Sequence, residues 1–241
     1  MSDPAPFREA AAVLQPLLES RPLIRAVNFH NTPHVRVAEY ERQLKLYSQA
    51  FAPVAEDDLD RCLKTGRWHK PRPGLIVALY NGYRDNYDVF LPLLKRYGFV
   101  GWFFVATAFV GTPAAEQVAF IDRRKLKTVA SEYPDGRYAL SWAELKEMDR
   151  NHVIASHTRN HSQLMTEDPA ALEGEIVGPQ EDFQTHLGHR VGAFASLSGA
   201  PYGEYPKADR LIEAAGYRFV FSNLKIQRLP EAPAQSARPR E

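Results

Sequence analysis

Residues 76 to 84 read I-V-A-L-Y-N-G-Y-R, and this stretch decides the fold. The apolar run at 75–79 is continuous, and the chain-breaking residues Pro71, Pro73 and Gly74 come before it. A short, uninterrupted apolar run is typical of a strand that is buried on both faces of a parallel sheet. The strand leads into Tyr80-Asn81-Gly82, so we expect these residues at the carboxyl edge of such a sheet.

Segments on both sides of this stretch alternate between strand and helix patterns. We expect further strands at 23–30, 102–106, 153–156, 191–195 and 218–222, and helices at 37–51, 59–63, 85–97, 114–130, 141–150, 169–186 and 206–215. This alternation predicts βαβ units and a parallel sheet. At least six strands at this spacing favour an α/β fold of the (β/α) barrel type with fewer than eight strands. An open doubly wound sheet is the alternative, although no G-x-G-x-x-G follows any strand.

Length and composition indicate one ordinary globular domain. The 241 residues are 44% hydrophobic and 24% charged, and we expect a single domain over 1–241 with loose ends at 1–6 and 230–241. The formal net charge is +1, which gives no reason to expect binding to nucleic acid or to a membrane. The N-terminus shows no signal peptide or membrane span, so a cytoplasmic location is expected. The oligomeric state stays open.

A pair of histidines follows one of the predicted strands. The segment 155–161 reads A-S-H-T-R-N-H, which places His157 and His161 four residues apart after an apolar run. In a helix, this spacing would put both imidazoles on one face, where they suit a zinc-like ion. The alternative is two polar loop residues that are neighbours by chance. The single cysteine, Cys62, provides no cysteine cluster for a metal.

Asn81 is the candidate for a third metal ligand. It follows the 75–79 strand and should share the carboxyl edge with the histidines. Its carbonyl oxygen is a neutral and therefore weaker ligand than a carboxylate. The alternative is turn chemistry, because Asn-Gly is a favoured turn dipeptide. Asp85 lies just beyond, where a helix N-cap is the simpler interpretation.

Taken together, these segments resemble polysaccharide deacetylases of the NodB-homology type, from about Arg25 to Arg228. The segment 78–82, A-L-Y-N-G, matches the first motif of that family, T-F-D-D-G, and His157–His161 fits its H-S/T-x-x-H motif. The segment 200–203, A-P-Y-G, fits a later turn, and 28–30, N-F-H, is similar to the opening strand. The resemblance implies a distorted (β/α) barrel of about seven parallel strands. It also implies removal of N- or O-acetyl groups from carbohydrates with a divalent metal, usually zinc.

The departures from the family pattern concern the catalytic groups. In the family, the first Asp of the first motif is the general base and the second is a metal ligand, whereas Tyr80 and Asn81 stand here. A phenol with an ordinary pKa near 10 is a poor base at neutral pH. The final motif of the family, Leu-x-x-His, supplies the general acid, and no histidine follows Phe221.

The resemblance therefore implies the following site. The metal ligands would be Asn81, His157 and His161, with Tyr80, Tyr202 and His30 as candidate catalytic residues. Candidates for binding an acetylated carbohydrate or a related amide are Arg84, Arg159 and Pro201. The two arginines would meet an anionic substrate, and solvated loop arginines are the alternative. The alternative function is a catalytically inactive homologue that binds a glycan or a protein partner.

Overall fold

The computed structural model describes residues 23–166 and 168–230. The expectations for residues 1–6 and 231–241 lie outside the described residues. Each predicted strand is present. The eight strands are β1 (Ile24–Phe29), β2 (Ala52–Pro53), β3 (Gly74–Asn81), β4 (Gly101–Val105), β5 (Val153–Ser156), β6 (Ala193–Ala195), β7 (Phe219–Phe221) and β8 (Ile226–Arg228).

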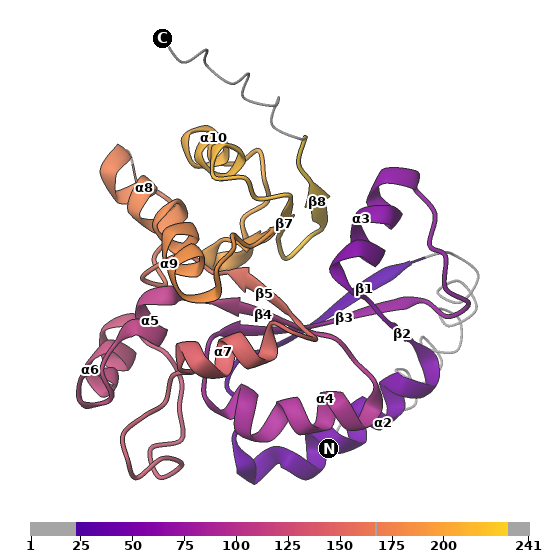
Figure 1. Cartoon of the computed structure of the whole chain (residues 1–241), viewed down its shortest axis with the longest axis horizontal. Coiled ribbons are helices and arrows are strands. Elements are labelled where there is room, and N and C mark those ends of the chain that lie inside the picture. The colour runs from indigo at the N-terminus through magenta and orange to yellow at the C-terminus, as the bar shows by residue number, and fades with distance from the viewer. Residues whose placement is uncertain (1–22, 167, 231–241) are drawn as a thin grey trace, which may run out of the picture.

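These strands form one sheet whose order follows the chain. The order is β1-β3-β4-β5-β6-β7-β8, and the short β2 also pairs with β3. All pairs are parallel except β7 with β8. The sheet curls into a half-barrel, as Figure 1 shows. The expected distorted barrel is confirmed, and the doubly wound alternative is not observed.

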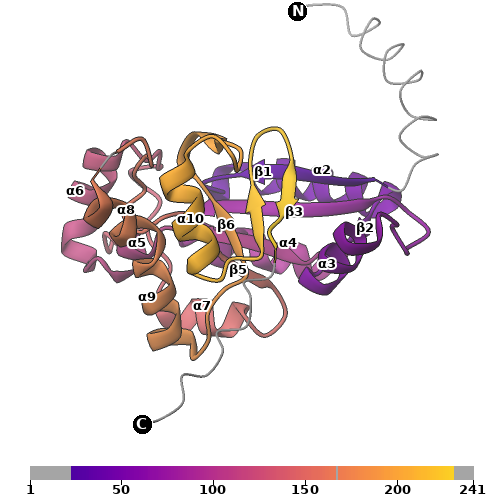
Figure 2. The same ribbon diagram turned by 90° about the horizontal axis from the view of Figure 1, so that it is seen from above.

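Helices connect successive strands as far as β7, and all but α3 lie on the outer face or at the ends of the sheet (Figures 1 and 2). They are η1 (His34–Arg36), α2 (Val37–Ala50), α3 (Glu56–Thr65), the π-helical turn η2 (Asn86–Phe90), α4 (Leu91–Tyr97), α5 (Thr107–Gly111), α6 (Ala114–Arg124), α7 (Trp142–Met148), α8 (Pro169–Ile176), α9 (Gly178–Leu187), η3 (Leu197–Gly199) and α10 (Pro206–Ala214). Within the described ranges, no helix is long and apolar enough to cross a membrane.

Strand β3 shows how the sheet separates two apolar layers. Leu75, Val77 and Leu79 pack in the larger core beneath the outer helices. Ile76 and Ala78 face the concave side and pack in a second cluster, against which Tyr80 also packs. Because successive strand residues point to opposite faces, the side chain of Tyr80 points into the half-barrel, on the same side as Ile76 and Ala78. Helix α3 contributes Leu59 to this inner cluster.

Three expected helices differ from the structure. The predicted helix at 169–186 is two helices, α8 and α9, which meet at Val177, and Pro179 in the first turn of α9 has no N–H to donate to the preceding turn. The helix predicted at 114–130 ends at Arg124, because Lys125 adopts a left-handed backbone with φ 54°. The helix predicted at 85–97 begins as a π-helical turn.

Candidate functional site

The register of the sheet gathers three strand ends at one edge. Asn81 pairs with Val105, and Val105 pairs with Ser156, so the ends of β3, β4 and β5 lie in one row. The N–H of His157 then donates to the carbonyl oxygen of Val105 at 2.9 Å. On the other side of β3, Phe29 pairs with Leu79, which brings His30 beside Tyr80. Residues that lie far apart in the sequence therefore meet at the carboxyl edge of the sheet.

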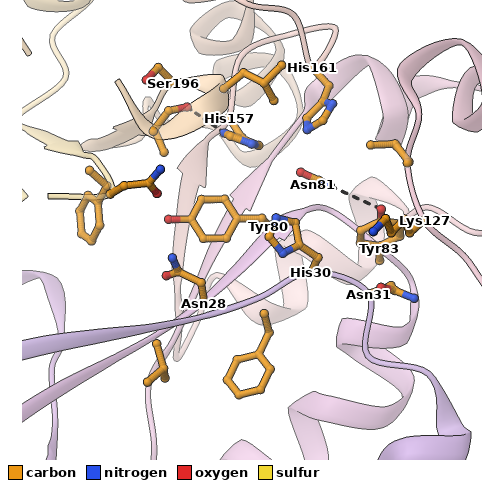
Figure 3. A pocket seen from close by; sticks show the side chains of 18 of the residues that line it. Asn28, His30, Asn31, Tyr80, Asn81, Tyr83, Lys127, His157, His161 and Ser196 are labelled. Carbon is orange, nitrogen blue, oxygen red and sulfur yellow. Dashed lines mark hydrogen bonds between the residues drawn. The ribbon is translucent and has the colours of Figure 1, made fainter. Parts of the chain in front are cut away.

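A cavity of about 920 Å³ opens at this edge. Five of the predicted site residues line it, and Figure 3 shows them together: His30, Tyr80, Asn81, His157 and His161. The remaining lining residues come from β1 and the loop after it, η1, α2, the turn after β3, the segment 125–127, and the ends of β6 and β7 with the segments that follow them. This cavity is the candidate functional site.

The two histidines are brought together by a tight loop. Thr158 and His161 adopt positive φ angles of 63° and 54°, and the helix considered for this segment is not formed. The Glu175 carboxylate fixes the loop by accepting from the backbone N–H groups of Arg159 and Asn160, at 3.0 and 2.8 Å. The ring centroids of the two histidines are 5.2 Å apart. The loop thus brings the two rings close together, edge to face, without the helix considered for this segment.

Both imidazoles are neutral at physiological pH. Burial lowers the pKa of His157 to about 3, and the nearby His161 adds to this effect. Burial also lowers the pKa of His161 to about 4, with further contributions from His30 and Arg124. Since a histidine must be deprotonated to bind a metal, both side chains are in the required form.

Asn81 presents an acceptor to the histidine pair. The residue is 3% exposed and has a φ of 77°, a conformation that Asn tolerates better than most residues. Its Nδ2 donates to the Tyr83 hydroxyl at 3.4 Å, while its Oδ1 is buried without a hydrogen-bond partner. Figure 3 shows this oxygen on the side of His157 and His161. A cation held between the three residues would satisfy it.

The ligand set contains no carboxylate. In the parts of the chain that the structure describes, no three His, Cys, Asp or Glu side chains converge to hold a metal ion. A site at this position therefore needs Asn81 as its third protein ligand. Two imidazoles and an amide oxygen suit a divalent ion of the zinc type but bring no negative charge to it.

Tyr80 fills the centre of the cavity and is unsuited to proton abstraction. Its ring stacks on Phe104 at 4.9 Å and on His30 at 5.5 Å, and meets His157 edge-on at 5.1 Å. Burial raises the pKa of Tyr80 to about 12. In Figure 3 its hydroxyl points away from Asn81 and His161. Tyr80 therefore contributes a ring that is packed between Phe104 and His30 rather than a base.

His30 is an imidazole of the cavity outside this ligand set. Packing against Tyr80 buries it in part, and this burial, together with the charge of Lys127, lowers the pKa of His30 below its usual value. A neutral imidazole keeps a lone pair that can accept a proton.

Four of the candidate residues lie outside the cavity lining: Arg84, Arg159, Pro201 and Tyr202. Arg84 forms ion pairs with Asp88 and Asp135 at 2.9 and 2.7 Å. Arg159 pairs with Asp182 at 3.0 Å, and the Tyr202 hydroxyl donates to Glu213. The structure therefore gives these side chains partners within the protein.

Sequence reasoning missed Tyr83, Lys125 and Lys127 in the lining. Tyr83 belongs to the stretch 76–84, so the sequence places it near Asn81. The sequence gives no sign of the hydrogen bond that its hydroxyl accepts from the Asn81 amide. The two lysines follow α6, which the sequence extends as a helix to 130, and no local signal places them at the cavity.

Comparison with known families identifies the family of this chain. The sequence model described as polysaccharide deacetylase matches residues 72–220, more than half of the chain. The chain therefore belongs to the polysaccharide deacetylase family. This family acts on acetylated carbohydrates and is generally metal-dependent. No curated protein matches the sequence.

Solved structures share the fold at low sequence identity. IcaB from Ammonifex degensii is 20% identical with a TM-score of 0.65, and the alignment covers 84% of each chain. A Streptococcus pyogenes deacetylase, PplD, in complex with acetate is 16% identical with a TM-score of 0.63 and 82% coverage of each chain. A de-N-acetylase from Aggregatibacter actinomycetemcomitans is 15% identical with a TM-score of 0.62, covering 85% of this chain and 90% of the other. These similarities concern the fold.

Proposed function

We propose that this protein is a metal-dependent deacetylase that hydrolyses N- or O-acetyl groups on a carbohydrate with an altered set of catalytic residues. The observation that carries the proposal is the buried Oδ1 of Asn81, which has no hydrogen-bond partner and faces His157 and His161. An unsatisfied buried acceptor destabilises a fold by about 1–3 kcal/mol, and a bound cation would remove this penalty.

Asn81, His157 and His161 would hold the metal, and zinc is favoured because imidazole nitrogens are among its preferred ligands. When bound, such an ion polarises an acetyl carbonyl and lowers the pKa of a water molecule. The neutral ligand set predicts weaker metal binding than a set with a carboxylate. Tyr80 presents the hydroxyl edge of its ring to the substrate, because Phe104 and His30 stack on its two faces.

His30 is the candidate for proton transfer. Its imidazole is neutral, stands beside Tyr80 and lies close enough to His157 and His161 to lower the pKa of both. Hydrolysis requires that the attacking water lose a proton and that the leaving amine or alkoxide gain one. A single imidazole can do both in turn, because the proton that it takes up is the one that the leaving group needs.

A catalytically inactive, glycan-binding homologue is the second candidate. The observation that favours it is the lining of the cavity, which contains no Asp or Glu among its described residues. Binding of a sugar by the aromatic and polar side chains of this lining needs neither a metal nor a base.

The first experiment measures bound zinc, iron, nickel, cobalt and manganese per chain by plasma mass spectrometry. The protein would be purified without chelator and without a histidine tag. We expect close to one metal ion per chain in the wild type and none in His157→Ala. His186→Ala is the matched control, because His186 stacks on Trp142 at the surface and not in the cavity. An absence of metal after incubation with excess zinc would refute the ligand assignment.

The second experiment measures acetate release from a panel of N- and O-acetylated oligosaccharides. Release by the metal-loaded wild type that is lost in His30→Ala, with the metal content unchanged, would support proton transfer by His30. A metal-loaded protein that releases no acetate from any member of the panel would leave the glycan-binding candidate in place of the enzyme.

A further inference from the structure

The charge of the candidate cavity is unbalanced. Its lining contains Arg36, Lys125 and Lys127 together with three histidines, and no Asp or Glu among the described residues. A second cavity of about 570 Å³, at the opposite ends of the strands, serves as a comparison within the same protein. That cavity is lined by three carboxylates and three arginines: Glu56, Asp57, Asp149, Arg150, Arg190 and Arg218. The whole chain has 30 basic and 29 acidic residues, so the imbalance belongs to the candidate site.

A well-defined backbone holds the two lysines at the rim. The N–H of Lys125 donates to carbonyl oxygens at the end of α6, and the N–H of Leu126 donates to the carbonyl oxygen of Ile121 at 3.0 Å. The side chain of Leu126 is 8% exposed and packs in an apolar cluster with Phe109 and Phe120. Lys125 and Lys127 therefore flank a buried anchor. Figure 3 shows Lys127 on the wall that carries Tyr83 and Asn31.

Among the described residues, no carboxylate pairs with either of these two lysines. Within the described ranges, neither Lys125 nor Lys127 forms an ion pair, whereas Arg36 is bound by Glu39 at 2.8 Å. Two acidic residues near the site have other partners. Glu132 accepts from the backbone N–H of His34 at 2.8 Å, and Glu175 holds the loop that carries His161. The positive charge at the rim is therefore available to a ligand.

We propose that the cavity selects an acetylated glycan whose sugar units carry a negative charge, and that Lys125 and Lys127 bind the anionic group. The inference rests on the proposed function, which supplies the acetylated carbohydrate, and names the class to which that carbohydrate belongs. Ammonium groups attract carboxylates and phosphates, and a lining without carboxylates removes the repulsion that would otherwise oppose them. The anion-binding role considered for Arg84 and Arg159 is thus assigned to Lys125 and Lys127, which have no acidic partner among the described residues.

The test compares the binding of charged and neutral oligosaccharides by isothermal titration calorimetry. A hyaluronan hexasaccharide, which alternates glucuronate with N-acetylglucosamine, is compared with the neutral chitin hexasaccharide. N-acetylglucosamine 1-phosphate and N-acetylglucosamine form a second pair, which tells a carboxylate from a phosphate. We expect the charged member of at least one pair to bind about three- to tenfold more tightly at about 0.05 M salt, and the preference to shrink at about 0.5 M.

The double variant Lys125→Gln with Lys127→Gln should abolish the preference, measured as the ratio of the two affinities within each pair. The matched control is Lys95→Gln with Lys146→Gln, which removes the same charge from exposed positions on α4 and α7 and should keep the preference. Equal affinity within both pairs, including no measurable binding, would overturn the inference, as would a preference that survives in the double variant. Because binding is measured without turnover, charge-selective binding without acetate release would refute the proposed function alone. Acetate release from neutral and charged substrates with equal efficiency, together with equal affinity, would refute this inference alone.

Discussion

The Nδ1 atom of His157 lies 2.8 Å from the backbone carbonyl oxygen of Ala195. A carbonyl oxygen only accepts, so Nδ1 carries the hydrogen and Nε2 keeps its lone pair. Strand β6 therefore fixes the tautomer of a side chain that follows β5. A backbone partner of this kind orients a metal-binding histidine and raises its basicity.

Replacing Asn81 by Asp should strengthen metal binding. A carboxylate at this position adds a full negative charge beside the ion, and we expect the zinc affinity to rise at least about tenfold, or about 1.4 kcal/mol. Without metal, the buried charge should lower the free energy of unfolding by about 1–3 kcal/mol. Calorimetry measures the affinity, and thermal unfolding with and without zinc measures the stability.

Asn31→Asp is the control for this variant, since Asn31 lines the same cavity without facing the histidines. An equal gain in zinc affinity in both variants would show that charge anywhere in the cavity suffices, contrary to the ligand role of Asn81.

The further change Tyr80→Asp, added to Asn81→Asp, is expected to create or increase acetate release, because it supplies the base that Tyr80 does not provide.

Tyr83→Phe should weaken metal binding without touching a ligand. The change removes the acceptor of the Asn81 amide, so the orientation of Oδ1 is no longer enforced, and we expect a stability loss of about 1 kcal/mol. Tyr133→Phe is the matched control, because the Tyr133 hydroxyl is buried and has no hydrogen-bond partner. That variant should be neutral or stabilising. Zinc titration and thermal unfolding of both variants check the prediction, and an unchanged zinc affinity in Tyr83→Phe would contradict it.

Asp85 should make the stability of the protein depend on pH. Burial raises the pKa of this carboxyl to about 7, against the opposing hydrogen bonds from Thr32. The folded state then binds a proton that the unfolded state has lost, so this contribution to stability is complete below about pH 4 and disappears as the pH rises to 7. The decrease amounts to at most about 4 kcal/mol, three pKa units at about 1.4 kcal/mol each.

Asp85→Asn should flatten this part of the stability profile and give a protein that is more stable than the wild type at pH 8. Asp135→Asn is the surface control, because Asp135 is exposed and its pKa is lowered by the N–H of Arg137 and by Arg84. Denaturant unfolding across pH 4 to 8 measures the slopes. A wild-type slope that persists in Asp85→Asn would assign the pH dependence to another group.

The strands could be predicted because their apolar runs are local signals. The 75–79 run and the Ser141 capping box appear in the structure where the sequence places them, and Ser141 accepts from the N–H of Glu144 at 3.3 Å. The loop at 157–161 could not be predicted in this way. Its shape depends on hydrogen bonds to Glu175, which belongs to a helix that begins after the loop. The local sequence preferences of the loop do not reveal such a contact.

The same reason separates the site residues that the sequence could find from those it could not. His30, Asn81 and His157 each lie at the end of a predicted strand, so the topology of the sheet brings them together at its carboxyl edge. Lys125 and Lys127 reach the cavity only because α6 stops at Arg124 and Leu126 folds back into the core. The partners of Arg84 and Arg159 are likewise set by tertiary contacts.

The left-handed backbone at Asn81 limits the residue types that can occupy this position. Asn, Asp and Gly are the residues that accept such a conformation most readily, and two of the three can ligate a cation. Replacing the neutral Asn side chain by the charged Asp side chain, or the reverse, thus requires no rearrangement of the main chain. In evolutionary terms, the stronger and the weaker form of the proposed metal site lie one substitution apart on the same scaffold, and the change can be made in either direction.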